Sequence, residues 1–239
     1  MSAARTHPAP TLAPGDLTLA WQSASLLIGY PDEELVARLP LLREAASRLP
    51  AAVGEPLLRF IGLVEATPLT ELAADYVATF DHRRRACLFL TYFSTGDTRK
   101  RGVALLSFKQ AYQQHGLELS DDELPDHLAV VLEFGATGDQ ATAWQLLLDH
   151  RAGLELLRIS LRDSGSPWAP VVESVCATLP PLRGSERDAV LKLAAEGPPD
   201  EEVGLAPFSM PELVGSPAGG GGGDGGPVSL PMPTFGGRS

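Results

Sequence analysis

Residues 76–134 read YVATFDHRRRACLFLTYFSTGDTRKRGVALLSFKQAYQQHGLELSDDELPDHLAVVLEF. The stretch combines apolar residues at helical spacing with a basic cluster at residues 81–85 and two polar strings, at residues 96–102 and 124–128. It lacks the spacing of a nucleophile elbow, a phosphate loop or a metal cage. Polar strings beside apolar helical faces are suited to gripping another polypeptide, so the stretch predicts an all-helical binding protein.

The same helical periodicity recurs along most of the chain, and no period-two strand pattern longer than a few residues competes with it. Asp16, Asp97, Ser120 with Glu123, and Ser185 are the expected helix caps, and Pro40 is expected to bend the second helix. The expected helices cover about residues 16–29, 32–42, 55–65, 68–80, 84–93, 98–115, 120–132, 141–162, 170–179 and 185–195.

These patterns divide the 239 residues into three parts. Residues 1–15 are rich in Pro and predict a disordered leader, and residues 16–196 predict a single all-α domain with the character of a helical bundle. Residues 197–239 are rich in Gly and Pro and contain too few apolar residues to offset the entropy of ordering. We therefore expect a disordered tail.

The formal net charge of −11 argues against a nucleic-acid partner, because phosphate contacts need a basic face. Six of the 19 Lys and Arg residues nevertheless lie within residues 83–101. This local positive charge is either a solvated helix end and loop or a docking site for acidic groups. The chain shows neither a standard signal peptide nor an uncharged apolar run of about 18 residues, so we expect no stable association with a membrane.

Two cysteines, Cys87 and Cys176, are too few for a disulfide framework or a four-thiolate metal site. Both lie in sequence surroundings that predict apolar helices, which is typical of inert buried thiols. This cysteine usage fits a reducing cytoplasm.

Three Asp-His dipeptides, which end at His82, His127 and His150, raise the possibility of a metal site. Adjacent residues on a helix diverge by about 100°, so a dipeptide does not present both ligands on one face. We therefore expect no metal and no other cofactor. A helical metal-dependent hydrolase that uses His82, Asp126, His127 and His150 is kept as the alternative from a different functional class.

Aromatic residues concentrate in the same stretch as the polar strings, and most of them are expected in the core. A minority would line a groove for an amphipathic helix or an apolar peptide, with Arg and His at its rim pairing with acidic groups of the partner. The aromatic residues are Tyr76, Phe80, Phe89, Tyr92, Phe93, Phe108 and Tyr112.

Four ordered motifs carry a resemblance to a known family. They are Tyr76-x-x-x-Phe80-Asp81, Cys87-Leu88-Phe89-Leu90-Thr91-Tyr92, Gly96-Asp97-Thr98-Arg99-Lys100-Arg101-Gly102 and Leu124-Pro125-Asp126-His127-Leu128. Together they closely resemble the assembly chaperones of respiratory nitrate reductase. The likeness covers roughly residues 17–182, and the Gly-rich tail lies outside it.

The resemblance implies an all-helical fold shared with the chaperones of molybdenum enzymes, and a cytoplasmic, non-catalytic role. The implied partner is the immature catalytic (alpha) subunit of membrane-bound nitrate reductase, including its N-terminal segment. This subunit would be kept competent for insertion of the molybdenum cofactor and an iron-sulfur cluster before it docks to the membrane. The proteins that deliver the molybdenum cofactor are candidates for a further partner, and a chaperone of another molybdenum reductase is the nearest alternative.

The resemblance also supplies candidate client-binding residues. Asp97, Arg99 and Arg101 match a Gly-Asp-x-Arg-x-Arg-Gly string, and Pro125-Asp126-His127 matches a Pro-Asp-His signature. Where relatives often carry histidine, this chain has Phe89, Phe93 or Thr95, which favours apolar contact there. The full candidate set is Tyr76, Phe80, Tyr92, Asp97, Arg99, Arg101, Pro125, Asp126 and His127.

Overall fold

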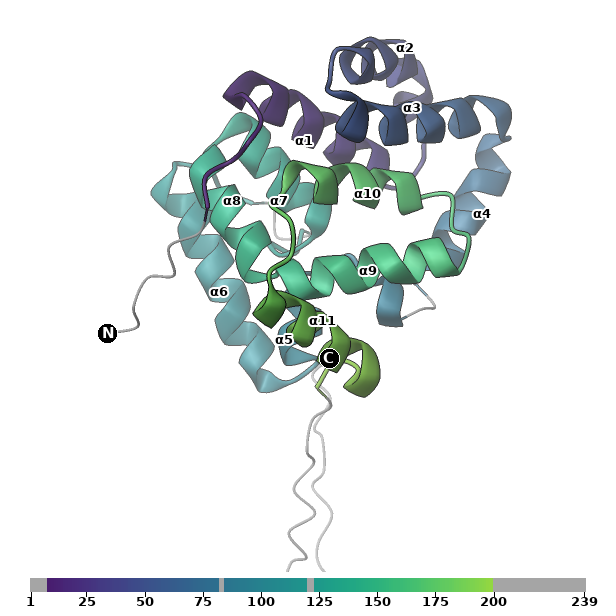
Figure 1. The fold of residues 1–239 in the computed structure, drawn as a ribbon. Coiled ribbons are helices and arrows are strands. Elements are labelled where there is room, and N and C mark those ends of the chain that lie inside the picture. The colour runs from purple at the N-terminus through teal and green to yellow at the C-terminus, as the bar shows by residue number, and fades with distance from the viewer. Residues whose placement is uncertain (1–7, 82–83, 120–122, 200–239) are drawn as a thin grey trace, which may run out of the picture. The chain divides into compact units, whose positions relative to one another are not determined.

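The computed structural model describes residues 8–81, 84–119 and 123–199. These residues confirm the expected all-α fold (Figure 1). The described elements are α1 (Pro14–Ile28), α2 (Glu33–Ser47), α3 (Ala51–Ala66), α4 (Leu69–Phe80), the 3-10 turn η1 (Arg84–Ala86), α5 (Tyr92–Thr95), α6 (Arg99–Gln114), α7 (Leu128–Thr137), α8 (Gln140–Asp149), α9 (Arg151–Asp163), α10 (Ala169–Thr178) and α11 (Gly184–Glu196).

Helix α1 is the centre of the core and packs against α2, α7 and α10. Its apolar residues point in several directions, so Leu17, Trp21 and Leu27 are all fully buried. The indole N–H of Trp21 donates to the Thr178 hydroxyl on α10 at 3.1 Å, and its ring stacks on Trp144 of α8. Because α1 is apolar on most sides, several helices pack around it.

Helices α2 and α3 pack against each other at the top of Figure 1, and α3 also packs against α10. Asp32 caps α2 by accepting the Leu35 N–H at 2.8 Å. Pro40 lies inside α2, yet the helix runs through it from Glu33 to Ser47, with Pro40 on the exposed side. The helix therefore continues past the proline to Ser47, five residues beyond the predicted end at residue 42.

The expected helix over residues 84–93 is wrong. After η1 the chain becomes extended, and its Phe89 forms an antiparallel bridge with His127. The Leu90 N–H donates to the Asp126 carbonyl at 2.9 Å, and the Leu128 N–H donates to the Leu88 carbonyl at 2.8 Å. These bonds replace the helical ladder, and helical structure resumes only in the short α5. Cys87 consequently lies outside a helix, half-buried, whereas Cys176 is buried in α10 as expected.

Helix boundaries around the polar strings also differ from the predictions. The helix expected from residue 120 begins only at Leu128, and residues 120–122, with the predicted Ser120 cap, lie outside the described residues. The helix expected over residues 141–162 is two helices that meet at His150, whose φ of −103° and ψ of 17° interrupt the run. The change of direction lets α8 and α9 pack on different neighbours.

Three predicted caps are replaced by other residues. Thr98, not Asp97, is the N-cap of α6, and Arg183, not Ser185, is the N-cap of α11. Helix α1 begins at Pro14, so Asp16 lies in its first turn rather than at its cap. In each case the helix starts within two residues of the prediction, but the capping residue is another one.

The ends of the chain differ in how much of them is described. The carbonyl of Pro8 accepts a hydrogen bond from the Trp144 indole N–H at 2.9 Å, so the end of the expected leader contacts the helical domain. The rest of the leader, residues 1–7, and residues 200–239 of the expected tail lie outside the described residues. None of the described helices is both long and apolar enough to cross a membrane.

Candidate functional site

Two polar strings that are far apart in the sequence meet at the segment around Phe89. Asp126 is fully buried, and its Oδ2 accepts the Thr91 N–H at 3.1 Å and the Thr91 hydroxyl at 2.5 Å. Thr91 is fully buried as well. Because a buried carboxylate needs donors to offset its lost hydration, these bonds fix the loop before α7 against the turn that starts α5.

Arg101, in the first turn of α6, joins the second polar string to the same place. One of its terminal nitrogens lies 3.1 Å from Asp97 Oδ1, and the other lies 3.9 Å from Asp126 Oδ2. The guanidinium also sits over the Phe89 ring, 5.2 Å from the ring centre. Within the described residues, Arg101 Nε, Arg101 Nη2 and Asp126 Oδ1 are buried without a hydrogen-bond partner. The pair is therefore held by charge and stacking more than by direct hydrogen bonds.

Tyr112, near the C-terminal end of α6, anchors the loop before α7. Its hydroxyl donates to the Pro125 carbonyl at 2.5 Å, and burial, with the nearby charge of Asp126, raises the pKa of the phenol above its usual value. Burial likewise raises the pKa of the neighbouring Cys87 thiol to about 11, which makes this cysteine an unreactive thiol near neutral pH.

His127 caps α7 and faces the bridge. Its Nδ1 accepts the Ala129 N–H at 3.3 Å, and its ring lies edge-on to Phe89, with ring centres 5.2 Å apart. Burial lowers the pKa of His127, and the nearby Asp126 opposes that shift only in part. The ring is therefore neutral at pH 7, and because Nδ1 is an acceptor, Nε2 carries the proton and is a donor.

These elements surround a cavity of about 400 Å³, which we call the His127 groove. The exposed Glu123 and Glu133 are among its lining residues, together with His127. The expected groove with Arg and His at its rim, pairing with acidic groups of the partner, stays a prediction. The groove is lined by Gly29, Phe89, Glu123, Leu124, His127, Ala129, Val130 and Glu133.

Tyr76 and Phe80 lie in a different cluster, on α4. Both rings pack against Trp168, with centres 5.3 Å and 5.5 Å from it, and the Tyr76 hydroxyl donates to the Ile28 carbonyl at 3.3 Å. Burial raises the pKa of Tyr76 to about 12. Tyr30, which is 56% exposed, packs edge-on against Tyr76 and follows the groove residue Gly29 in the chain. This aromatic cluster therefore adjoins the groove through the end of α1.

A family model described as nitrate reductase delta subunit matches residues 46–173. The match includes Thr91, Arg101 and Asp126 of the buried network, while α1 lies before it. This chain belongs to the nitrate reductase delta subunit family. The match agrees with the resemblance that the four motifs carry.

Individual relatives extend this finding. The chain is 40% identical over 167 residues to the nitrate reductase-like protein NarX of Mycobacterium tuberculosis, covering 67% of this chain and 24% of NarX. It is 32% identical over 168 residues to the probable nitrate reductase molybdenum cofactor assembly chaperone NarJ of Bacillus subtilis, covering 69% of this chain and 90% of that protein. The chain thus spans about a quarter of the length of NarX but nearly all of the Bacillus relative.

A solved structure, a putative redox enzyme maturation protein from Archaeoglobus fulgidus, matches 80% of this chain and 99% of its own. The sequence identity is 19% and the TM-score is 0.46. At that TM-score the similarity adds nothing to the family assignment.

In this delta subunit family member, the nine candidate residues fall into three groups by position. Asp97 and Arg99 are exposed, Arg101 beside Asp97 is partly covered, and the half-buried His127 lines the groove. Tyr92, Pro125 and Asp126 are buried, so they support the site from beneath. Tyr76 and Phe80 belong to the adjoining aromatic cluster.

Several groove and network residues of the family member were not among the candidates. Phe89 was expected only to make apolar contact. Thr91, Leu124 and Glu133 lie in the stretch that carries the motifs but were given no role of their own. Thr91 could not be found from local pattern, because its role depends on Asp126, which is 35 residues away. Leu124 is the one that a local signal could have identified, since it is a large apolar residue beside a proline in a polar string.

The residues of the hydrolase alternative do not form a ligand cluster in the described part of this family member. Among the described residues no group of three or more His, Cys, Asp or Glu side chains is placed to hold a metal ion, and His82 lies outside them. Asp126 is bound to Thr91, His127 caps α7, and His150 packs against Phe108.

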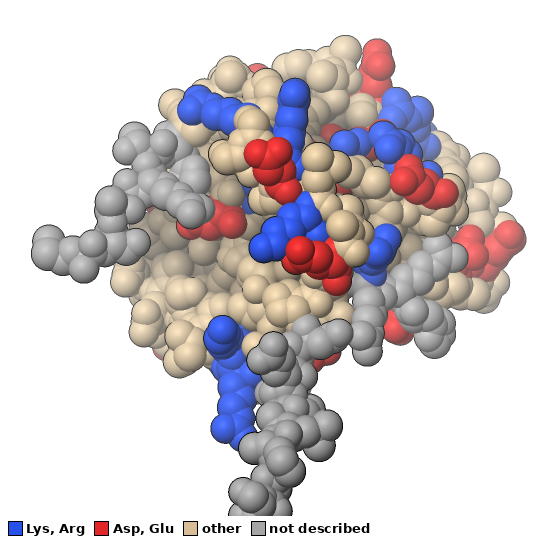
Figure 2. All heavy atoms as spheres, turned by 60° about the horizontal axis from the view of Figure 1, so that its bottom comes forward, with Lys and Arg blue, Asp and Glu red and all other residues tan. Residues whose placement is uncertain are grey.

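The charged side chains of one face of the molecule are mixed in sign. Figure 2 shows blue and red side chains interspersed with tan on this face rather than a continuous basic field.

Proposed function

We propose that this chain is a client-specific assembly chaperone. It binds the immature catalytic (alpha) subunit of a membrane-bound respiratory nitrate reductase in the cytoplasm and keeps that subunit competent for insertion of the molybdenum cofactor and an iron-sulfur cluster. Docking of the subunit to the membrane follows release. Membership of the delta subunit family supports this role, as does the similarity to the probable nitrate reductase molybdenum cofactor assembly chaperone of Bacillus subtilis.

The observation that carries the proposal is the convergence of separate motif segments on one open groove. The segment around Phe89, the start of α6 and the loop before α7 are tied together by Asp126, Thr91 and Arg101. The network lies beneath the surface, while Phe89, Leu124 and His127 line the cavity. Buried support of this kind pre-organises a binding surface and lowers the entropy cost of binding.

The groove lining indicates the chemistry of the client segment. Leu124 is 41% exposed beside Phe89 and Val130, so an apolar side chain of the client gains burial there. Glu123 and Glu133 at the rim favour a basic residue next to that apolar anchor. The His127 Nε2–H is a donor suited to a client carbonyl. We infer that the N-terminal segment of the catalytic subunit supplies these groups.

The chaperone performs no bond chemistry in this mechanism. It stabilises the cofactor-free conformation of the client by binding it more tightly than the alternatives, and it shifts the population only by that difference in affinity. Release follows when cofactor insertion removes the bound conformation. Contact with the proteins that deliver the molybdenum cofactor stays a prediction.

Calorimetric titration tests the proposal. The full-length chain is titrated with a synthetic peptide of the N-terminal segment of the cognate nitrate reductase catalytic subunit, and a scrambled peptide of the same composition is the control. We expect saturable binding of the native peptide alone. Equal heats for both peptides, together with no binding to the whole immature subunit, would contradict the proposed function and would favour another molybdenum reductase as the client.

A further inference from the structure

Helix α11 is attached to the rest of the domain by a small contact area. Its main helical neighbour is α9, and Val190 is the single residue of α11 that is buried. The next residue, Leu191, is 68% exposed. The connection from α10 runs through Pro180 and Pro181, whose missing N–H groups leave it without a helical ladder. Helix α11 is therefore an accessory element rather than part of the core.

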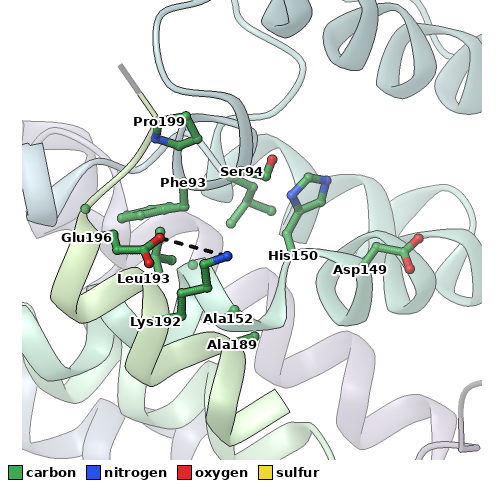
Figure 3. Close-up of a pocket in the computed structure, with 13 residues that line it drawn as sticks. Phe93, Ser94, Asp149, His150, Ala152, Ala189, Lys192, Leu193, Glu196 and Pro199 are labelled. Atoms are coloured by element: carbon green, nitrogen blue, oxygen red, sulfur yellow. Dashed lines mark ion pairs between the residues drawn. The ribbon is translucent and has the colours of Figure 1, made fainter. Parts of the chain in front are cut away.

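The space beneath α11 is incompletely filled. One cavity of about 310 Å³ lies between Phe93, His150 and Leu193 (Figure 3). A second cavity, of about 560 Å³, lies toward the start of α11, and both are lined in part by Ala152 of α9 and Ala189 of α11. Both pockets open to solvent along the side of α11. The groove that holds α11 therefore leaves room for further side chains beside the helix.

The C-terminal end of α11 is held by contacts with two other segments. The Arg85 guanidinium donates to the Ala194 carbonyl at 3.1 Å, one of the last-turn carbonyls that a helix cannot satisfy internally. After α11, the Pro199 carbonyl lies so close to Gly96 that a Cβ on that glycine would overlap it. Residues 184–199, which we call the cover, thus extend over the corner between α5 and α6.

The hollow beneath the cover shares a wall with the His127 groove. Phe89 lines the groove, and the next residue, Leu90, lines the cavity under α11. Leu90 is also the residue whose N–H donates to the Asp126 carbonyl. A movement of the cover would therefore change the packing around Leu90, in the same short segment whose Phe89 lines the His127 groove.

We propose that the cover occupies in cis a helix-accepting groove between α5 and α9, and that an amphipathic helix of the client displaces it. This inference rests on the proposed function. The occupant is indicated by α11 itself: its Val190, Leu193 and Ala194 form a small apolar stripe toward α9, and Arg85 donates to its Ala194 carbonyl. A client helix with Val, Leu or Ala at the same spacing, and larger side chains for the two hollows, fits the groove better than α11 does.

The family match covers the groove but not the cover. The matched residues end at 173, within α10, and α11 lies beyond them. Helices α5 and α9, which bound the groove, consist of matched residues.

Two variants of the full-length chain separate the cover from the core. Val190→Asp places a charge at the buried contact, and Leu191→Asp places the same charge at the adjacent exposed position. In hydrogen exchange, V190D should speed exchange across α11 while α1 and α7 stay protected, and L191D should leave exchange unchanged. If the cover is closed in about nine-tenths of the molecules, V190D should tighten binding of the N-terminal client peptide on the order of tenfold. Faster exchange in α11 with unchanged or weaker peptide binding would overturn the proposal.

Hydrogen exchange of the unaltered chain with the same peptide tests displacement of the cover separately from client binding, the proposed function. We expect the peptide to slow exchange around His127, in α5 and in the first turn of α9, and to speed exchange in α11. Slower exchange around His127 with no change in α11 would overturn the cover and leave the proposed function standing. No slowing anywhere in the chain would overturn both.

Discussion

The buried carboxylate of Asp126 accepts hydrogen bonds from both the backbone N–H and the hydroxyl of Thr91, 35 residues earlier in the chain. The aspartate of the Pro-Asp-His signature is therefore turned away from solvent, while the following histidine lines the groove. A single dipeptide thus supplies both the internal support of the site and part of its surface. This arrangement separates residues whose substitution should unfold the site from residues whose substitution should weaken binding.

Asp126→Ala should lower the stability of the domain, because Asp126 supports the groove from inside and is not part of its surface. The change removes the acceptor for two buried Thr91 donors, and it also removes the buried carboxylate that lies near the Arg101 guanidinium. We expect the free energy of unfolding to fall by about 2–4 kcal/mol, because buried donors without a partner are costly. Urea denaturation measures this change. Asp163→Ala, at an exposed carboxylate, is the control and should stay within about 0.5 kcal/mol of the unaltered protein.

The conservative variant Asp126→Asn refines the same prediction. Its amide oxygen still accepts from Thr91, so we expect a smaller loss of stability than for D126A. If D126A loses client binding but keeps its full stability, Asp126 contacts the client directly and its assignment as internal support is wrong.

Gly135→Ala should destabilise the packing between α1 and α7. A Cβ at Gly135 would meet the Trp21 ring at less than contact distance and the Ala143 Cβ at 2.7 Å. We expect a loss of about 1–3 kcal/mol from this overpacking. Gly62→Ala, inside α3, meets nothing within 4 Å and should instead stabilise the protein by about 0.5–1 kcal/mol. Thermal unfolding of the two variants should therefore shift in opposite directions, and a shift in the same direction would contradict the packing.

The domain should lose stability as the pH falls below about 6.5. Burial lowers the pKa of His127 and of His150, although nearby carboxylates oppose the shift in both. The unfolded chain then binds more protons than the folded chain between the lowered values and the usual value of 6.5, so the contribution is fully present above 6.5 and is lost as the pH falls through the folded pKa values.

The double variant His127→Asn, His150→Asn tests the source of this pH dependence. Asparagine retains a side chain that can cap α7 but does not titrate. We expect the free energy of unfolding of the double variant to change less than that of the unaltered protein between about pH 7 and pH 5. An identical slope for both proteins would assign the acid sensitivity to other groups.

Leu124→Ser should weaken client binding without a large loss of stability. Leu124 lines the groove and is 41% exposed, whereas Leu63 on α3 is 37% exposed and lies outside the groove lining. Removal of one apolar side chain that becomes buried on binding costs about 1–2 kcal/mol, or roughly tenfold or somewhat more in affinity. Leu63→Ser is the matched control and should bind the N-terminal peptide with the affinity of the unaltered protein. Equal affinities of all three proteins would move the client away from Leu124.

The all-helical fold was predictable because most helices are set by local signals. Apolar spacing located α3, α4, α10 and α11 to within a few residues, and Asp32 with the acidic first turn marked the start of α2. The failures share a different cause. The segment of Leu88 and Leu90 pairs with residues 126–128. The spacing of apolar residues within either segment does not reveal this long-range pairing.

The site was predictable as a set of motifs but not as an arrangement. The motifs identified Arg101, Asp126 and His127, which do lie together around Phe89. They did not show that Asp126 is buried or that its partner is Thr91, because burial and partner choice are decided by tertiary packing. The acidic residues of the groove were missed for the same reason, since Glu123 precedes α7 and Glu133 lies within it, and only the tertiary structure shows that both line one cavity.

The most direct test of the central claim is site-specific crosslinking to the client. A photo-crosslinking amino acid replaces Leu124 in the full-length chain, and in a matched protein it replaces Leu63. Each protein is irradiated with the immature nitrate reductase catalytic subunit, and adducts are located by mass spectrometry. We predict an adduct from position 124 to the N-terminal segment of the catalytic subunit, with position 63 giving none. Binding of the subunit with no adduct from position 124, or with equal adducts from both positions, would contradict a client site at the His127 groove.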